Sequence, residues 1–242
     1  MYEIESNNNL LNLNSFIMKT LKFFTLILIS LMILSVGCKK DEVKKDEFSQ
    51  SIHNIVPDSI ITNMKKLGMP INAGLTPPNL EKIYFASPFI MKATSDPYDY
   101  FQPGFQFYDY LVKFYDQVDS SLSIKLDYLN GTESGSGVGG FISGTNNSFS
   151  IFVKVHSVVN GDTTDKADMI QVISGTIVSG GVKNFYFANF MLNNYGNIYG
   201  SWMGEGKGRI IYDSDGFSPE QSSFVVPESK KKSAVLKSVS EK

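Results

Sequence analysis

The chain has 242 residues, 42% of them hydrophobic, and a formal net charge of −2 from 22 basic and 24 acidic residues. This balance gives no positive electrostatic field that would attract nucleic acid. Arginine side chains make most of the specific contacts to phosphate and guanine, and Arg209 is the only arginine in the chain. The apolar content is enough for a large core, so the composition excludes a nucleic-acid-binding protein and a chain that is disordered throughout.

Residues 18–37 have the order of a secretory signal peptide. Met18-Lys19-Thr20-Leu21-Lys22 is a short positive segment, and an apolar run from Phe23 to Val36 follows it. This run is shorter than the roughly 20 residues that span a bilayer, so a cleaved leader is predicted rather than a transmembrane helix. The 17 residues before Met18 are acidic and rich in Asn, and we interpret them as an upstream extension.

Cys38, the only cysteine, follows this leader directly. The stretch Leu34-Ser35-Val36-Gly37-Cys38 resembles the lipobox of bacterial lipoproteins, with Ser35 in place of the usual Leu. The resemblance implies that the Cys38 thiol receives a diacylglycerol, that the leader is cut before it, and that the new amino group is acylated. We therefore expect a membrane anchor, since several acyl chains hold a protein more firmly than one. A single cysteine leaves no intrachain disulfide and no thiolate metal cluster.

Lys39 to Glu47 form a run of mixed charges, which is typical of a solvated tether. The run also resembles the surface-export signal of Bacteroidota lipoproteins, which implies an outer-membrane location with the domain facing the cell surface. We divide the chain into the extension and signal peptide (1–37), the charged tether (38–54), a β-barrel domain (55–226) and a disordered basic tail (227–242).

The domain is predicted to begin with a short helix. Asp58 or Ser59 is placed to cap it, and Gly68 is placed to end it. One face carries four apolar residues, Ile60, Ile61, Met64 and Leu67. A proline-rich connector over residues 69–79 then leads to the first strand.

From there the pattern predicts strands almost to the end of the chain. They are expected near residues 81–93, 105–116, 121–130, 137–145, 148–159, 166–178, 182–193 and 207–213. Apolar and polar residues alternate clearly over 122–128 and 149–155, and turn-forming pairs such as Asn130-Gly131 separate the strands. The fold class is therefore all-β: an antiparallel meander of about eight strands that closes or packs on itself to hide its edges.

The connector from Gly68 through Pro77-Pro78-Asn79 and the segment Gly140-Phe141-Ile142-Ser143-Gly144 resemble those of small Bacteroidota outer-membrane lipoproteins with calycin-like (lipocalin-type) domains. The resemblance implies that the meander closes into a calycin-like barrel. It carries no assigned activity. A β-sandwich remains the alternative architecture.

Catalytic and metal motifs are weak. His53 and His156 are the only histidines, which leaves too few ligands for zinc and one histidine in the domain for a triad, with no G-x-S-x-G elbow. The G-x-G-x-x-G string at residues 135–140 precedes a strand rather than a helix, so we expect a flexible loop. Residues 213–220 could offer calcium two Asp side chains, but a plain Asp-Gly turn is predicted.

We therefore expect no enzyme, no cofactor and no metal site. An enzyme would have to use carboxylates such as Asp127, Glu133 or Glu205.

Aromatic residues are the most suggestive feature, because they occur on both faces of one predicted strand. The candidate ligand-binding residues are Phe105, Phe107, Tyr108, Tyr110, Phe114, Tyr115 and Trp202. Aromatic side chains suit a small apolar ligand inside a barrel or a stacked sugar ring on a surface. The predicted function is a non-enzymatic lipoprotein that binds a small apolar ligand, in a space left by small residues such as Gly140, Gly144 and Gly175. The alternative is a surface carbohydrate-binding or structural interaction module.

We predict that Cys38→Ser leaves an unprocessed precursor without lipid, because a serine hydroxyl does not replace the thiolate as lipid acceptor. Mass spectrometry of membrane fractions measures this directly. Acylated protein in the variant would contradict the predicted anchor.

Overall fold

The computed structural model describes residues 48–226. The predictions for the leader, for Cys38, for the charged run after it and for the basic tail lie outside the described residues.

Two helices precede eleven strands. The helices are α2 (Gln50–Ile55) and α3 (Asp58–Lys66). The strands are β1 (Leu75–Thr76), β2 (Ile83–Ala86), β3 (Phe89–Thr94), β4 (Tyr110–Val118), β5 (Ser123–Asn130), β6 (Glu133–Thr145), β7 (Ser148–Val159), β8 (Asp162–Val178), β9 (Gly181–Asn193), β10 (Gly208–Asp213) and β11 (Phe217–Gln221). The expectation of a mostly β chain with an antiparallel meander is confirmed.

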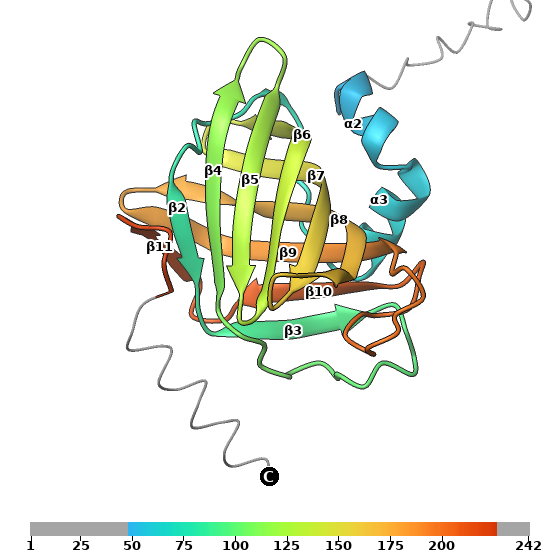
Figure 1. Cartoon of the computed structure of the whole chain (residues 1–242). Helices are drawn as coiled ribbons and strands as arrows, with labels where there is room; N and C mark the ends of the chain where they lie inside the picture. Colours follow the sequence, from blue (N-terminus) through green and yellow to red (C-terminus); the bar gives the residue numbers. More distant parts are fainter. Residues whose placement is uncertain (1–47, 227–242) are drawn as a thin grey trace, which may run out of the picture. The chain divides into compact units, whose positions relative to one another are not determined.

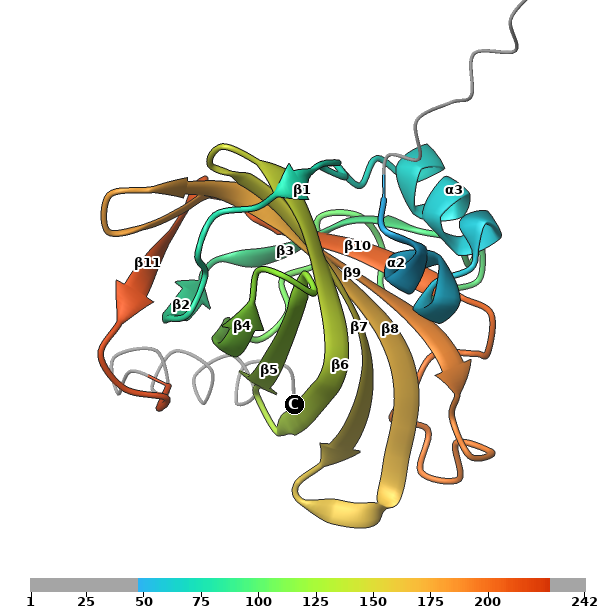
Figure 2. The ribbon, with the colours of Figure 1, turned by 90° about the horizontal axis from the view of Figure 1, so that it is seen from above.

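Strand pairing closes on itself. Neighbours pair in the order β2-β4-β5-β6-β7-β8-β9, all antiparallel, and β11 pairs with both β9 and β2. Eight strands therefore form a ring, which Figure 2 shows from above. The edge of β9 is shared: residues 181–183 pair with β11, and residues 186–190 pair with β10, which carries β3 on its other side.

The strand boundaries differ from the sequence prediction in four places. The strand expected over 81–93 divides at Ser87 and Pro88 into β2 and β3, which have different partners. Residues 105–107 do not begin β4 but bond to β3, with the amide of Met91 donating to Phe105 O and that of Phe107 to Phe89 O. β6 begins at Glu133, so the glycine string is part of a strand and not a loop. The short strands β1 and β11 were not predicted, because two residues, or five with an internal proline, give little alternation.

The interior of the ring is packed with side chains. Its buried apolar residues come from seven of the eight ring strands, all but β11, and from β10, and include Tyr84, Tyr110, Phe114, Leu126, Ile142, Phe149, Ile151, Val153, Ile173, Val182, Phe185, Phe187 and Ile211. A ring of eight strands is just wide enough for its side chains to fill. The core of this protein is therefore the inside of the ring.

The two helices cover the outside of the ring at β7 to β10 (Figure 1). Ile52 of α2 and Ile61 and Met64 of α3 pack with the outward-facing Phe152 and Ile170. The predicted helix and its apolar face are confirmed. Pro57 precedes its first residue and no side chain caps it, so the predicted cap is wrong.

The boundary between tether and domain also needs correction. Residues 50–55, assigned to the end of the tether and the start of the domain, form α2, and both Phe48 and Ile52 are buried against the sheet. The folded part therefore already includes residue 48. Neither described helix is long and apolar enough to cross a membrane.

Replacing Phe149 by Ala should lower the free energy of unfolding by about 3–5 kcal/mol, because the ring loses a fully buried aromatic side chain and keeps a cavity. Phe217→Ala, at a residue that is 37% exposed, is the matched control and should change it far less. Urea denaturation of the full chain measures both. Equal losses would show that the interior is not the core.

Candidate functional site

One end of the ring is polar inside. Gln171 on β8 pairs directly with Asn189 on β9, Asn189 pairs with Arg209 on β10, and Arg209 pairs with Thr94 on β3. Directly paired residues of neighbouring strands point to the same face of a sheet. The four side chains therefore form a row across one end of an otherwise apolar interior, which we call the polar row.

Arg209 is held by Asp99 from the loop after β3. Its Nε and Nη2 donate to the two carboxylate oxygens of Asp99, both at 2.7 Å. Burial raises the pKa of Asp99, but hydrogen bonds from Arg209, Thr94 and the amide of Phe101 outweigh it and hold this pKa below its ordinary value. The guanidinium also lies over the ring of Phe101, 4.9 Å from its centroid. This partly buried, two-bonded pair fastens the loop to the ring.

Glu133 at the start of β6 is the second acid at this end. The phenol of Tyr128 donates a short hydrogen bond to its Oε1 and lies 2.6 Å from the hydroxyl of Ser157. Burial raises the pKa of Glu133 to about 7, although the hydrogen bond from Tyr128 and the charge of Arg209 both act to lower it. The carboxyl group therefore changes protonation near neutral pH.

Local sequence explains how these groups are placed. A Cβ at Gly135 would lie 2.5 Å from the ring of Tyr128, so only glycine leaves room for that ring beside Glu133. Tyr110 stacks between Phe89 and Tyr128, with ring centroids 5.3 and 5.4 Å away, and its hydroxyl donates to Oε1 of Gln171 at 3.2 Å. The phenol rings thus connect the polar row to the acid.

A cavity of about 50 Å³ lies between these groups, and we call it the polar cavity. Its lining is Phe89, Phe107, Tyr110, Tyr128, Asn130, Glu133, Phe187, Asn189, Arg209 and Ile211. Two buried atoms at this level have no hydrogen-bond partner in the structure, Oδ1 of Asn189 and Nε2 of Gln171. An unsatisfied buried polar atom costs about 1–3 kcal/mol, which a bound polar group would recover. The volume suits a group of one or two water molecules in size.

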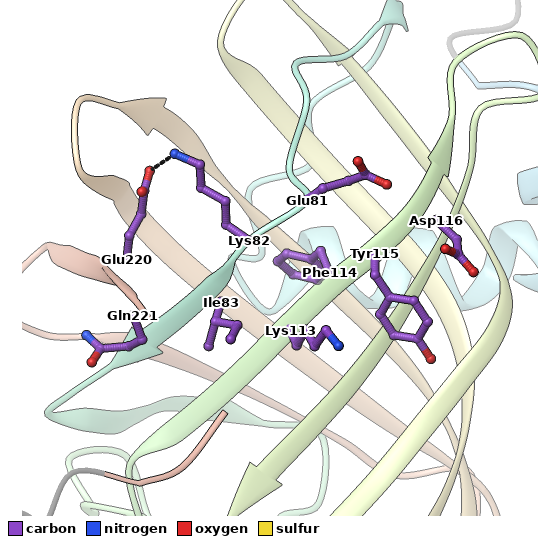
Figure 3. A pocket seen from close by; sticks show the side chains of 9 residues that line it. All are labelled: Glu81, Lys82, Ile83, Lys113, Phe114, Tyr115, Asp116, Glu220 and Gln221. Atoms are coloured by element: carbon purple, nitrogen blue, oxygen red, sulfur yellow. Dashed lines mark hydrogen bonds and ion pairs between the residues drawn. The ribbon is translucent and has the colours of Figure 1, made fainter. Parts of the chain in front are cut away.

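A larger hollow lies on the outside, where β2, β4 and β11 meet. It measures about 530 Å³ and is lined by Glu81, Lys82, Ile83, Lys113, Phe114, Tyr115, Asp116, Glu220 and Gln221. Figure 3 shows Lys82 and Glu220 pointing toward one another, and their ion pair measures 2.6 Å. This open groove carries three acids and two lysines, and Lys82 and Glu220 neutralise one another.

The candidate aromatic residues do not form one site. Phe107 and Tyr110 line the polar cavity, and Phe105 packs against Phe107 at its outer side, with ring centroids 5.0 Å apart. Phe114 is buried in the core, and Tyr115 lies on the outer face, where its hydroxyl donates to Asp127.

Tyr108 and Trp202 have other roles. Tyr108 is half-exposed and its ring lies against Gly131 of the hairpin between β5 and β6. The indole of Trp202 is buried and donates to Asp165 at 2.7 Å, which anchors the loop between β9 and β10. Of the seven predicted residues, Phe107 and Tyr110 line the polar cavity, and Phe105 packs against Phe107.

The glycines do not leave the expected space. A Cβ at Gly140 would lie 2.9 Å from the carbonyl of Ile124, one at Gly144 2.2 Å from that of Ser148, and one at Gly175 2.4 Å from Val182. Neighbouring atoms already occupy these positions, so a wide internal pocket built from small residues is not present among the described residues.

The remaining chemical candidates lie apart from the cavity. His156 on the outer face bonds Asp168 through Nδ1 at 2.9 Å, and Tyr195 donates to the same carboxylate. Ser136 is the strand neighbour of His156, and neither residue lines the polar cavity or the outer groove. Within residues 48–226 no group of three or more His, Cys, Asp or Glu side chains is placed to hold a metal ion.

The three carboxylates considered for an enzyme do not share a site. Asp127 bonds Tyr115 on the outer face, Glu133 lies at the polar cavity, and Glu205 accepts from the amide of Asn194 in the loop before β10.

Sequence reasoning missed most of the polar row. Gln171 interrupts the apolar run Met169-Ile170-Gln171-Val172-Ile173, and Arg209 is the only arginine. A polar residue inside an apolar strand and an isolated guanidinium were signals that something polar is buried. Their common location depends on the register of four strands.

Comparison of the chain with family models, with characterised proteins and with solved structures finds no match. The site is therefore interpreted from its own geometry.

Glu133 should make the protein less stable as pH rises from about 4.5 to 7. In this window the unfolded state has released the Glu133 proton and the folded state retains it, so the free energy of unfolding falls and then levels off. Glu133→Gln removes this contribution. Asp213, whose pKa burial raises to about 6, adds a change of the same sign in both proteins. Thermal unfolding from pH 4 to 9 should therefore show the wild type losing Tm relative to the variant, and parallel curves would contradict the assignment.

Proposed function

We propose that this protein is a non-enzymatic, lipid-anchored lipoprotein of the outer membrane, whose calycin-like barrel binds a small ligand by one end group. The observation that carries the proposal is the polar cavity. It lies beside a closely packed apolar core, it reaches the carboxyl group of Glu133, and its lining includes Asn189, whose Oδ1 is a buried acceptor without a partner. The proposed lipid anchor at Cys38 is supported only by the leader sequence that precedes it.

The cavity volume determines how such a ligand is held. Pockets that enclose a drug-sized molecule measure about 300–1,000 Å³, whereas this cavity measures about 50 Å³. An apolar molecule cannot enter the interior whole. A polar end group fits, and the apolar remainder would lie against Phe107, Phe105 and Phe101, whose rings are in mutual contact.

A second candidate function has an observation of its own. Tyr98 and Tyr100, on the loop between β3 and β4, are 93% and 88% exposed. Exposed tyrosine rings suit stacking on sugars, so a surface carbohydrate-binding or interaction module is the alternative.

Blocking the cavity tests the first proposal. The full chain should take up the uncharged, largely apolar fluorescent dye 2-naphthalenemethanol, whose hydroxymethyl end group is small enough for the cavity, at one saturable site, followed by dye fluorescence. Asn189→Leu places an apolar side chain in the cavity and should weaken this uptake about tenfold or more. Asn193→Leu, on the exposed end of the same strand, is the matched control and should bind as the wild type does.

Absence of saturable uptake in the wild type would contradict the proposal. Uptake that Asn189→Leu leaves unchanged would also contradict it, because the dye would then bind elsewhere. Sugar binding that Tyr98→Ala abolishes, without dye uptake, would favour the alternative.

A further inference from the structure

Among the residues that line the polar cavity, the groups with unused hydrogen-bonding capacity include two acceptors, while the unpaired donor Nε2 of Gln171 belongs to a residue outside this lining. Two groups on its wall accept hydrogen bonds and have accepting capacity left: the carboxyl group of Glu133, and Oδ1 of Asn189, which has no partner. The side-chain nitrogen of Asn130 is already used, since it donates to the carbonyl of Tyr108 at 2.6 Å. A group bound here would have to supply hydrogen-bond donors.

The positive charge on the wall is already balanced. Asp99 takes both Nε and Nη2 of Arg209, and the guanidinium lies over Phe101 and Phe107. Asp99 and Arg209 together contribute no net charge. With Asp99 counted, the charged side chains at this end sum to one negative charge when Glu133 is ionised, which favours a cation over an anion.

The rest of the wall is aromatic. Phe89, Phe107, Tyr110, Tyr128 and Phe187 surround the cavity with five rings. Aromatic rings attract compact cations, and the attraction is stronger where water is excluded. The volume of about 50 Å³ leaves room for a group such as methylammonium and excludes a bulky one.

From these contacts we propose that the end group bound in the polar cavity is a primary ammonium group, with Glu133 and Asn189 as its hydrogen-bond acceptors. The inference rests on the proposed function and names the class of ligand: a small amine whose apolar part lies outward along Phe107 and Phe105. A carboxylate end group would face the charge of Glu133, and a quaternary ammonium would bring no donor to Asn189.

Binding of an ammonium ion should depend on pH through Glu133. The ionisable groups that face this acid are Tyr128 from β5, Tyr110 from β4 and Arg209 from β10 with its partner Asp99. Burial raises the pKa of both tyrosines well above 10, so they stay neutral. Glu133, with its pKa of about 7, is then the one of these groups that titrates between pH 6 and 8.

The test uses methylammonium chloride as the probe, added to the full chain and followed by nuclear magnetic resonance of the Asn189 side-chain amide. Because the ionised fraction of Glu133 rises about tenfold from pH 6 to pH 8, the affinity should rise by about the same factor. Acetamide, which is neutral, should bind more weakly at pH 8, and tetramethylammonium and formate should not bind.

Glu133→Gln keeps the shape of the side chain and removes its charge. It should weaken methylammonium binding about tenfold or more at pH 8 and abolish the pH dependence. Asp213→Asn is the matched control, since Asp213 is a second buried acid with a raised pKa that does not line the cavity, and it should bind as the wild type does. If Glu133→Gln does not fold, the pH series and the comparison of probes on the wild type still test whether the cavity binds an ammonium group.

Formate or acetamide bound as tightly as methylammonium would overturn the inference, and so would methylammonium binding that does not change between pH 6 and 8. Uptake of the apolar dye that depends on Asn189, without methylammonium binding, would overturn the ammonium assignment and leave the proposed function in place. If the protein shows neither dye uptake nor methylammonium binding, both the ammonium assignment and the proposed function are overturned.

Discussion

Closure of the strand ring by β11 is the constraint on which the rest of the structure depends. This strand of five residues bonds β9 through residues 217–219 and β2 through residues 220–221, and so joins the first and last members of the ring. An unpaired strand edge leaves backbone donors and acceptors without partners and invites association with other chains. Once the ring closes, the number of its strands determines how wide the interior is.

That width explains why the interior is a core rather than a wide pocket. Large side chains such as Phe149, Phe185 and Tyr110 meet across the ring and leave little room. Gly140, Gly144 and Gly175 do not offset this, because neighbouring backbone and side-chain atoms already occupy the space beside them. Packing is incomplete at the end where Glu133, Asn189 and Arg209 replace apolar residues, because hydrogen-bonding groups need partners as well as contact.

The candidate site could be predicted only in part. Phe107 and Tyr110 were recognised because an aromatic run stands out in a sequence, and both line the polar cavity. The same criterion included Phe114, Tyr115 and Trp202, which serve the core, the outer face and a loop. Aromatic character alone does not distinguish a residue that lines a cavity from one that packs in the core, because both positions need the same apolar surface.

The sequence by itself determined the local structure. Alternation gave the long strands, positive-φ residues such as Asn160-Gly161 gave the turns between them, and apolar spacing gave α3. It did not locate the break at Pro88, the short closing strand β11 or the row from Gln171 to Arg209. These features were decided by tertiary structure, because they depend on which strands become neighbours and in which register. Residues 171, 189 and 209 are far apart in the chain and meet only when β8, β9 and β10 pair.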